Sequence, residues 1–434
     1  MINLKDLKKI GYFIGYFLIA LSAACSSSNN NNDTVEFDPA MAPQNVQVVS
    51  GDGDSSAVQN TISWTRDPLN PDYVIYVSNT PGVTENSSKV VPTATGFTYA
   101  THSGDVIAGN TYYYRVQASL NGESSVLSEE VSGTPQLSIT SNALNDVAWN
   151  GVDTLVAVGD SGVILHSANG MADAWDDDLT SGTNQSLTAV IWESVNSQFL
   201  IVGAGSSVLI GDGSTGWSSI DLEVSPAANL EDVAWLGDRY IAVGKNGIII
   251  TSNGEGTVWT KLAVLTGLDP AVDVSAITLK GVAGDGNNLI VVVGTNGTIL
   301  TSTNDGVNWQ AATSNVNNDL NDISWDGSQF GVVGSNDTIL TSPDGLSWTK
   351  HNPGTSDITF IAATQLVSSS LANPVLSAVG SSGTFVVSPD AVTGYAIPTG
   401  TNQQLSGITW VDNVSPPYFV MVGNDGTVLN SLLQ

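Results

Sequence analysis

Apolar and polar residues alternate in short runs between about residues 41 and 135, with glycine, asparagine, aspartate and proline between the runs. A period of two places every second side chain on the same face of a strand, so each run predicts one half-buried β-strand. Ile62 and Trp64 are expected to share one face of a strand, and Tyr73, Ile75 and Val77 one face of the next. The clearest run is AGNTYYYRVQA, whose predicted inward residues are Tyr112, Tyr114, Val116 and Ala118 and whose outward residues are Tyr113, Arg115 and Gln117.

The rest of the chain, from about residue 137 to 434, repeats one pattern of strands. The first strand of each unit alternates in the copies LNDVAW (144–149), LTAVIW (187–192), LEDVAW (230–235), LNDISW (320–325) and LSGITW (405–410), with degenerate copies from Ile277 and Ile358. A second strand ends in a glycine that follows valine in every copy, at Gly159, Gly203, Gly244, Gly294, Gly334, Gly380 and Gly423. These glycines are 40 to 50 residues apart, which is the length of one four-stranded propeller blade.

The turns of the repeat are distinctive as well. Asparagine, aspartate, serine and glycine follow each Val-Gly pair, and these residues predict a two-residue hairpin turn with positive φ. A third strand then leads through a serine-rich turn to a tryptophan that opens the fourth strand, as at Trp259, Trp309 and Trp348.

Seven such units predict an all-β fold with a seven-bladed β-propeller over residues 136–434. The last unit stops at Gln434 after three strands, and QLSITS (136–141) is left over before the first complete unit. Because an unpaired strand edge is unfavourable, we expect residues 136–141 to complete the last blade and close the ring.

Residues 41–135 resemble a fibronectin type III domain. Trp64 corresponds to the tryptophan of an early strand, and Tyr112 to the tyrosine that opens the penultimate strand and bonds back to its own loop. The closing LSEEVSGTPQ matches the usual exit of that family. The resemblance implies a β-sandwich acting as a spacer. No RGD tripeptide is present to indicate integrin-type adhesion.

The repeat resembles two groups of propellers. TSTNDGVNW, TSPDGLSW and TSNGEGTVW are similar to the Asp-box, S-x-D-x-G-x-x-W, of sialidase-like propellers, although Asn304 and Gly254 replace the aspartate and the copy around Asp344 is one residue short. In those families the box is a folding element at the outer edge of a blade. The turn after Val-Gly also resembles that of photosystem II assembly and stability factors, which dock proteins. That resemblance implies a propeller that binds another molecule. The basic residues that a photosynthetic docking surface would use are absent from this sequence.

The N-terminus is typical of an exported protein. Lys5, Lys8 and Lys9 precede an apolar run from Ile10 to Leu21, which is too short to span a bilayer, and small residues 22–24 follow. Cys25 comes next and is the only cysteine of the chain. The arrangement resembles the lipobox of bacterial lipoproteins, although Ser22 stands where a large apolar residue is usual. It implies a signal peptide over residues 1–24 and a diacylated Cys25, with residues 25–40 as a lipidated flexible tether.

The charge balance narrows the choice of partners. The formal net charge is -30, from 11 lysines and arginines against 41 aspartates and glutamates. Such a surface repels phosphate backbones, so nucleic acid is excluded as a partner. It also repels anionic lipid head groups, so the acyl chains on Cys25 must hold the protein on the membrane. Ser26 rather than aspartate after the cysteine favours the outer membrane over the inner membrane.

The sequence offers little material for catalysis. Sialidases bind a carboxylate with three arginines, whereas Arg239 is the only arginine after residue 136. General acid/base glycosidases need two carboxylates about 5–10 Å apart. The propeller glutamates are Glu193, Glu223, Glu231 and Glu255. The pair Glu231-Asp232 recurs in register as Asn145-Asp146 and Asn321-Asp322, which favours hydrogen bonds between blades over catalysis.

Other kinds of chemistry find no better support. His102, His166 and His351 are too scattered for a metal site or a nucleophile–base pair. Asp52-Gly53-Asp54 and Asp176-Asp177-Asp178 lack the spacing of a known calcium loop and are interpreted as solvated turns. No cofactor, metal or catalytic residue is therefore predicted.

The sequence thus predicts a non-catalytic cell-envelope lipoprotein. Its propeller would bind a protein or a glycan, and the membrane would be reached through the lipid anchor. The alternative is an extracellular carbohydrate-active enzyme, a glycoside hydrolase or lyase, with a fibronectin accessory domain. A convergent set of charged residues in the central channel would distinguish the enzyme from the binding module.

Overall fold

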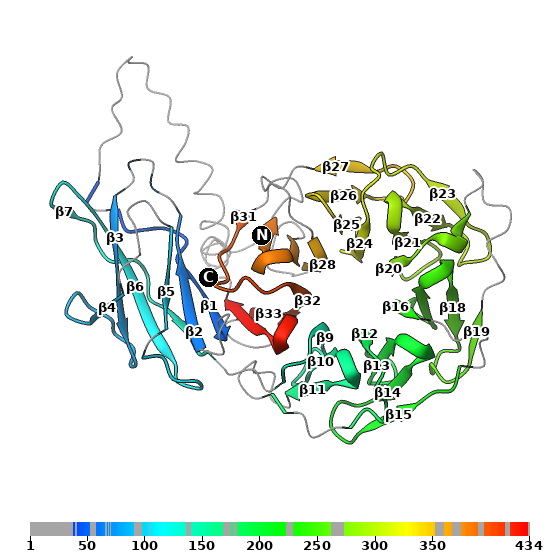
Figure 1. Ribbon diagram of the computed structural model, residues 1–434. Helices are drawn as coiled ribbons and strands as arrows, with labels where there is room; N and C mark the ends of the chain where they lie inside the picture. Colours follow the sequence, from blue (N-terminus) through cyan, green and yellow to red (C-terminus); the bar gives the residue numbers. More distant parts are fainter. Residues whose placement is uncertain are drawn as a thin grey trace, which may run out of the picture.

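A computed structural model describes residues 38–39, 41–52, 58–65, 67, 69, 71–90, 98–103, 105–135, 140–167, 175–176, 180–222, 229–261, 273–351, 360–366, 375–388, 395–412 and 417–432. The described residues form β-strands joined by turns and seven short 3-10 helices. Figure 1 shows a ring of small sheets with a two-layered sandwich on its flank.

Two sheets make up the N-terminal sandwich. One sheet has the order β1-β2-β5, with strands β1 (Gln47–Asp52), β2 (Val58–Ser63) and β5 (Tyr99–His102). The other has the order β4-β3-β6-β7, with β8 also paired to β6, and its strands are β3 (Asp72–Ser78), β4 (Ser88–Val90), β6 (Tyr112–Leu120), β7 (Glu123–Ser124) and β8 (Val131–Gly133).

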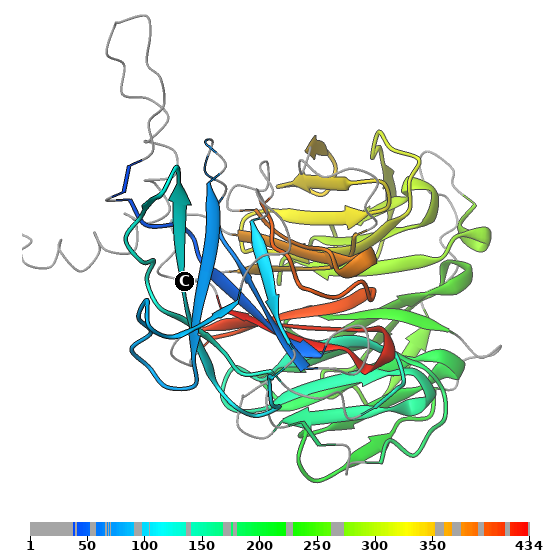
Figure 2. The ribbon, with the colours of Figure 1, turned by 60° about the vertical axis from the view of Figure 1, so that its left-hand side comes forward.

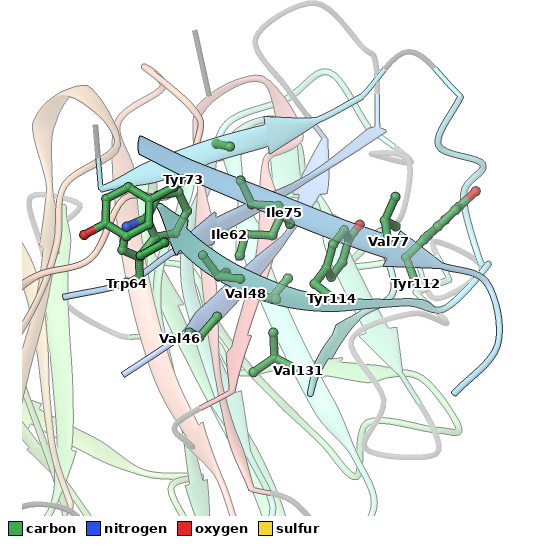
Figure 3. Packing of buried hydrophobic residues seen from close by; sticks show 13 residues of the cluster. Val46, Val48, Ile62, Trp64, Tyr73, Ile75, Val77, Tyr112, Tyr114 and Val131 are labelled. Atoms are coloured by element: carbon green, nitrogen blue, oxygen red, sulfur yellow. The ribbon is translucent and has the colours of Figure 1, made fainter. Parts of the chain in front are cut away.

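The predicted inward residues of the sandwich form its core. Ile62 and Trp64 pack with the inward residues of β3 and β6 in one buried cluster, seen from close by in Figure 3. One outward position differs from the prediction. Gln117 is buried, because its amide donates to Glu85 and to the Ser125 carbonyl and its oxygen accepts from the Tyr76 hydroxyl.

Tyr112 makes the return hydrogen bonds expected of it. Its hydroxyl accepts a hydrogen bond from the Ile107 amide at 2.9 Å and donates one to the Asp105 carbonyl at 3.3 Å. The loop before β6 is thereby fixed to the strand that it enters.

Seven sheets form the ring, one of them continuous with the β1-β2-β5 sheet, and each begins with a strand next to the central axis. These inner strands are β9 (Leu144–Trp149), β12 (Leu187–Glu193), β16 (Leu230–Trp235), β20 (Leu279–Gly284), β24 (Leu320–Trp325), β28 (Phe360–Leu366) and β32 (Leu405–Val411). The degenerate copies therefore begin two residues later than predicted, at Leu279 and Phe360, since these residues pair with the Val-Gly glycines Gly294 and Gly380.

The remaining strands follow in order toward the outside. The second strands are β10 (Leu155–Gly159), β13 (Gln198–Gly203), β17 (Tyr240–Gly244), β21 (Ile290–Gly294), β25 (Phe330–Gly334), β29 (Val375–Gly380) and β33 (Tyr418–Gly423). The third are β11 (Ile164–Ser167), β14 (Val208–Gly211), β18 (Ile249–Ser252), β22 (Ile299–Ser302), β26 (Thr338–Ser342), β30 (Phe385–Ser388) and β34 (Val428–Leu432). The fourth are β15 (Trp217–Ser219), β19 (Trp259–Lys261), β23 (Gln310–Ala312), β27 (Thr349–His351) and β31 (Tyr395–Ala396).

Short 3-10 helices join most second strands to third strands. They are η1 (Asp160–Gly162), η2 (Ala204–Ser206), η3 (Lys245–Gly247), η5 (Thr295–Gly297), η6 (Ser381–Gly383) and η7 (Asn424–Gly426), while η4 (Val274–Ala276) precedes β20. The turns have three residues rather than the predicted two. The prediction of positive φ is confirmed, for example at Asn246 (58°) and Gly247 (65°).

The glycine that ends each second strand is required by a close approach. A Cβ on Gly244 would lie 2.1 Å from the Asn229 carbonyl oxygen, and one on Gly423 would lie 2.0 Å from the Gln404 oxygen. In the six blades where the residue before the inner strand is described, it packs directly on this glycine, so any side chain there would force the two strands apart.

Neighbouring blades pack face to face, and the last blade packs on the first. Leu144, Val147 and Leu155 of the first blade share a buried cluster with Val420 and Val422 of the last. The ring is therefore closed by side-chain packing, which makes the chain an all-β protein with a β-propeller.

The last blade is completed by the sandwich. β1 pairs antiparallel with β34, so β32-β33-β34-β1-β2-β5 is one six-stranded sheet. Figure 2 shows the dark-blue β1 beside the red strands of the last blade. The expectation that residues 136–141 fill this position is wrong, because β1 occupies the edge of β34. Residues 136–139 lie outside the described part.

Alternate side chains of β1 belong to different cores. Val48 is buried in the sandwich, whereas Val49 is buried with Phe385, Phe419 and Leu429 of the last two blades. Gln59 on β2 adds a hydrogen bond of 2.6 Å to the Gly400 carbonyl. The sandwich and the propeller thus share a sheet, and β1 contributes a side chain to the core of each.

Candidate functional site

A cavity of about 490 Å³ occupies the channel at the centre of the ring. Its lining residues come from six inner strands, β9, β12, β16, β20, β24 and β32, and are mainly apolar, with four tryptophans among them. The polar group of this wall is Asp146, Asp232 and Asp322, from the first, third and fifth blades.

The three aspartates are held by backbone amides. Asp146 accepts from its neighbour Val147 at 2.8 Å and from Val190 of the next blade at 2.8 Å. Asp232 repeats this arrangement with Val233 at 2.7 Å and Val282 at 2.8 Å. Asp146 and Asp232 therefore each join two adjacent blades, as the recurrence in register predicted.

The environment makes these carboxylates weak acids. Loss of hydration raises the pKa of Asp146 to about 7, against the opposing effect of its two amide hydrogen bonds and with a smaller contribution from the charge of Asp322. Burial, followed by repulsion from Asp322, also raises the pKa of Asp232 well above its usual range. The channel thus holds acidic groups that resist ionisation.

Small residues alternate with the aspartates around the ring. Ala189, Gly281 and Gly407 take the same position in the second, fourth and seventh blades. A Cβ on Gly407 would lie 2.6 Å from the Cα of Asp146, so the small residue lets the next inner strand approach closely.

Tryptophans border the cavity where the inner strands end. Trp192, Trp235 and Trp325 are only partly buried, and each packs on the aromatic residue at the start of the second strand, with ring centroids 4.5 to 4.7 Å apart. Their indole N–H groups donate no hydrogen bond within the described part of the chain. Trp149 differs, since its N–H donates to Asp412 at 3.0 Å.

The second position of the inner strands also joins blades. Asn145 donates to the Leu187 carbonyl at 2.8 Å, and Thr188 donates to the Leu230 carbonyl at 2.9 Å. Lys280 donates to Asn321 at 2.8 Å and forms an ion pair with Asp319 at 3.2 Å. The interpretation of this recurring polar position as a contact between blades is confirmed.

The glutamates considered for catalysis are separated. Glu193 is buried and accepts from the backbone of Val195 and Asn196, so it holds a turn. Glu231 lies 3.7 Å from Lys245, and burial raises its pKa against the effect of the lysines. Glu255 is exposed in an outer turn, and Glu223 lies outside the described residues.

The remaining cations are also away from the cavity wall. Arg239 lies in the turn after β16 and is bonded to Asp238 and to Asp305 of the next blade. Lys245 lies in the turn η3, and Lys261 and Lys350 lie on the outer strands β19 and β27, as the repeat predicted.

The Asp-box-like turns lie at the outer edge of their blades. Asp344 accepts from the amides of Leu346 and Ser347, and the Trp348 indole donates to the Gly345 carbonyl at 3.1 Å. Asn304 takes the place of the aspartate by accepting from Asn308 at 2.8 Å. The turn is thus preserved despite the substitution.

The histidines and acidic turns that were considered as sites and set aside can be located only in part in the described residues. The histidines lie on different elements, with His102 bonded to Tyr114 and Asp105 and His351 bonded to Thr341. Within the described ranges, no group of three or more histidine, cysteine, aspartate or glutamate residues is placed to hold a metal ion. Cys25 and the centres of both acidic turns, 53–54 and 177–178, lie outside those ranges.

No helix among the described residues has the length and apolar character needed to cross a membrane. The apolar run Ile10 to Leu21 is outside the part of the chain that the structure describes.

The cavity and its tryptophan border were not predicted from the sequence. The signal was present, because five of the seven inner strands have tryptophan as their last or next-to-last residue and three carry aspartate at the same position. The direction of these side chains depends on how neighbouring strands pack, which the repeat alone does not specify.

Comparison with known proteins identifies the fold but does not identify a family. No protein-family description and no curated sequence matches the chain. Among solved structures it is similar to YCF48 from Cyanidioschyzon merolae, with a TM-score of 0.53 and 16% identity over 67% of this chain and 96% of that one.

Two further structures give the same result. YCF48 bound to D1 peptide has a TM-score of 0.53 and 14% identity, over 68% of this chain and 93% of that one. The WD40 β-propeller domain of Doa1 has a TM-score of 0.52 and 14% identity, over 68% and 94%. What the chain has in common with these proteins is the β-propeller fold.

Proposed function

We propose that this chain is a non-catalytic lipoprotein of the cell envelope whose propeller binds a protein partner. Diacylated Cys25 would anchor it, by preference to the outer membrane, after removal of residues 1–24. The tether 25–40 and a fibronectin type III domain over 41–135 would hold the propeller away from the bilayer.

The bonding of the channel aspartates carries the non-catalytic part of this proposal. Both oxygens of Asp146 and of Asp232 accept backbone amides, one of them from the next blade. A general acid or base must exchange its proton with a substrate within hydrogen-bond reach. Carboxylates already used to join two blades are poorly suited to that task.

The fold supports binding to a protein. One of the similar structures is a propeller described as bound to a peptide, and the cavity here has a border of partly exposed indoles. Tryptophan is enriched where protein surfaces contribute most to binding energy.

The test combines partner isolation with an activity screen. Tagged full-length chain, cross-linked in native membranes, is expected to co-purify one protein in near-equal amount, and cells with untagged chain provide the control. No sialoside or neutral glycoside should be hydrolysed by the purified chain. Turnover of a fluorogenic glycoside that Asp146→Asn or Asp232→Asn abolishes would favour the carbohydrate-active enzyme instead.

A further inference from the structure

Two sets of turns share one face of the propeller, which we call the hairpin face. It consists of the turns between first and second strands and those between third and fourth strands. Asn196, in a turn of the first kind, donates to the Gly254 carbonyl in a turn of the second kind at 3.0 Å. Arg239 joins the two kinds again at the Asp305 carbonyl, also at 3.0 Å. The cavity lies at this end of the channel, where the inner strands finish.

Large apolar side chains stand exposed on the hairpin face of five successive blades. The exposed fractions are 70% for Val152, 73% for Val195, 63% for Val258, 76% for Val307 and 37% for Leu346. Single exposed apolar residues are ordinary on protein surfaces. Five at turn tips of the same face are a pattern that calls for a physical reason.

The shape of the turns does not supply that reason. In each case another residue holds the turn by accepting backbone amides, and these acceptors are Asn150, Glu193, Asn253, Asn304 and Asp344. Valine is a strand-forming residue and is not among those that favour turns. The exposed side chains therefore contribute little to folding and are free to contact another molecule.

The charges beside these residues are acidic. Exposed carboxylates lie on the same turns at Asp153, Glu255 and Asp344, and on other turns of this face at Asp212, Asp238 and Asp412. Arg239 is the cation among the described turn residues of the hairpin face. It forms ion pairs with Asp238 and Asp305, which neutralise its charge. The hairpin face thus combines apolar tips with unbalanced negative charge.

We propose that the hairpin face docks a protein segment whose apolar side chains are flanked by lysine or arginine. This rests on the protein-binding function proposed above and adds the face and the chemistry of the partner. Burial of the valines would provide affinity, and complementary charge would select the partner and speed its approach.

Charge also argues against two other occupants. A second copy would bring the same carboxylates against this face, and like charges are unfavourable across an interface. An anionic bilayer surface would be repelled for the same reason.

The test uses the full-length chain and defined peptides. A short fluorescent peptide of alternating leucine and lysine should bind, whereas peptides with glutamate for lysine or serine for leucine should not. The double variant Val195→Ser/Val307→Ser should weaken binding by about tenfold, since the loss of a few central contacts can remove much of the affinity. Asn246→Ser, on the opposite face, should leave it unchanged, because serine takes the corresponding place at Ser161 and Ser382.

Several outcomes would overturn the assignment. These are absence of binding to the leucine–lysine peptide, equal binding of the leucine–glutamate peptide, and equal loss in the two variants. Self-association that Val307→Ser abolishes would instead make the occupant a second copy.

Photo-cross-linking in cells separates this inference from the proposed function. An adduct formed from position 307 and not from position 246 supports the hairpin face. The reverse result rejects the face but retains protein binding, whereas no adduct from either position contradicts both.

Discussion

Single residues decide how closely the blades of this propeller approach one another. Asp146 reaches across to the Val190 amide of the next blade, and Gly407 gives the Asp146 backbone room on the other side. The bonding carboxylate and the small residue both occupy the third position of an inner strand. The ring thus needs carboxylates in some blades and small residues in others.

The raised pKa of Asp146 predicts a pH dependence of stability. A carboxyl group whose pKa is about 7 when folded binds protons more tightly than in the unfolded chain, where its pKa is near 4. Its contribution is therefore complete below about pH 4 and is lost as the pH rises toward 7. Melting temperatures between these values should fall less steeply in Asp146→Asn than in the natural chain.

Asp153→Asn is the matched control for that measurement. Asp153 is exposed, and hydrogen bonds from Asn150 and Thr154 lower its pKa. Its replacement should therefore not reduce the fall in melting temperature between pH 4 and 7. Equal slopes for the natural chain and Asp146→Asn would show that the buried carboxyl does not titrate in this range.

Among the elements, β1 has the most unusual position. It is the first strand of the sandwich, and it also completes the blade built from the end of the chain. A strand from the start of the described chain therefore pairs with a strand from its end, and Figure 1 shows the blue and red strands side by side. An edge that would otherwise be free to aggregate is covered in this way.

We expect Val49→Ala to loosen the last blade from the sandwich side. Val49 is 1% exposed, and the loss of its methyl groups should lower the free energy of unfolding by about 1–3 kcal/mol. Hydrogen exchange of the β34 amides should become faster, because β34 pairs with this strand.

Val48→Ala provides the comparison on the same strand. Val48 faces the sandwich core, so the larger increase in exchange should fall on the sandwich strands. Unchanged β34 protection in Val49→Ala would mean that the pairing with β1 adds little to the stability of the blade.

At the scale of the whole molecule, the shared sheet makes the sandwich part of the propeller rather than a loosely linked spacer. The tether proposed for residues 25–40 leads into the described chain just before β1. The described sandwich and propeller are therefore expected to move as one unit.

The anchor predicts a change in fractionation. Cys25→Ser should leave the protein in the soluble fraction and abolish globomycin-sensitive processing, because no thiol remains to be acylated. Ser26→Ala is a suitable control and should still fractionate with membranes. If Cys25→Ser stays with the membranes as the natural chain does, the lipid anchor is rejected.

Local periodicity was sufficient to predict the seven repeated units and the inward residues of the sandwich strands β2, β3 and β6. Alternation and Val-Gly spacing reflect short-range geometry, since a pleated strand fixes the face of each side chain. The hydrogen bonds between blades could also be anticipated, because a polar residue recurring at one position meets the same neighbour in each unit.

Tertiary structure alone decided which strand completes the last blade. Residues 136–141 and β1 both precede the propeller, and nothing in local pattern distinguishes one from the other as a partner of β34. The choice depends on a second core, which buries Val49 while Val48 faces the sandwich. The grouping of the four exposed valines and Leu346 on one face was likewise decided by the tertiary structure, because the side-by-side packing of successive blades brings the turns of five blades onto the same face.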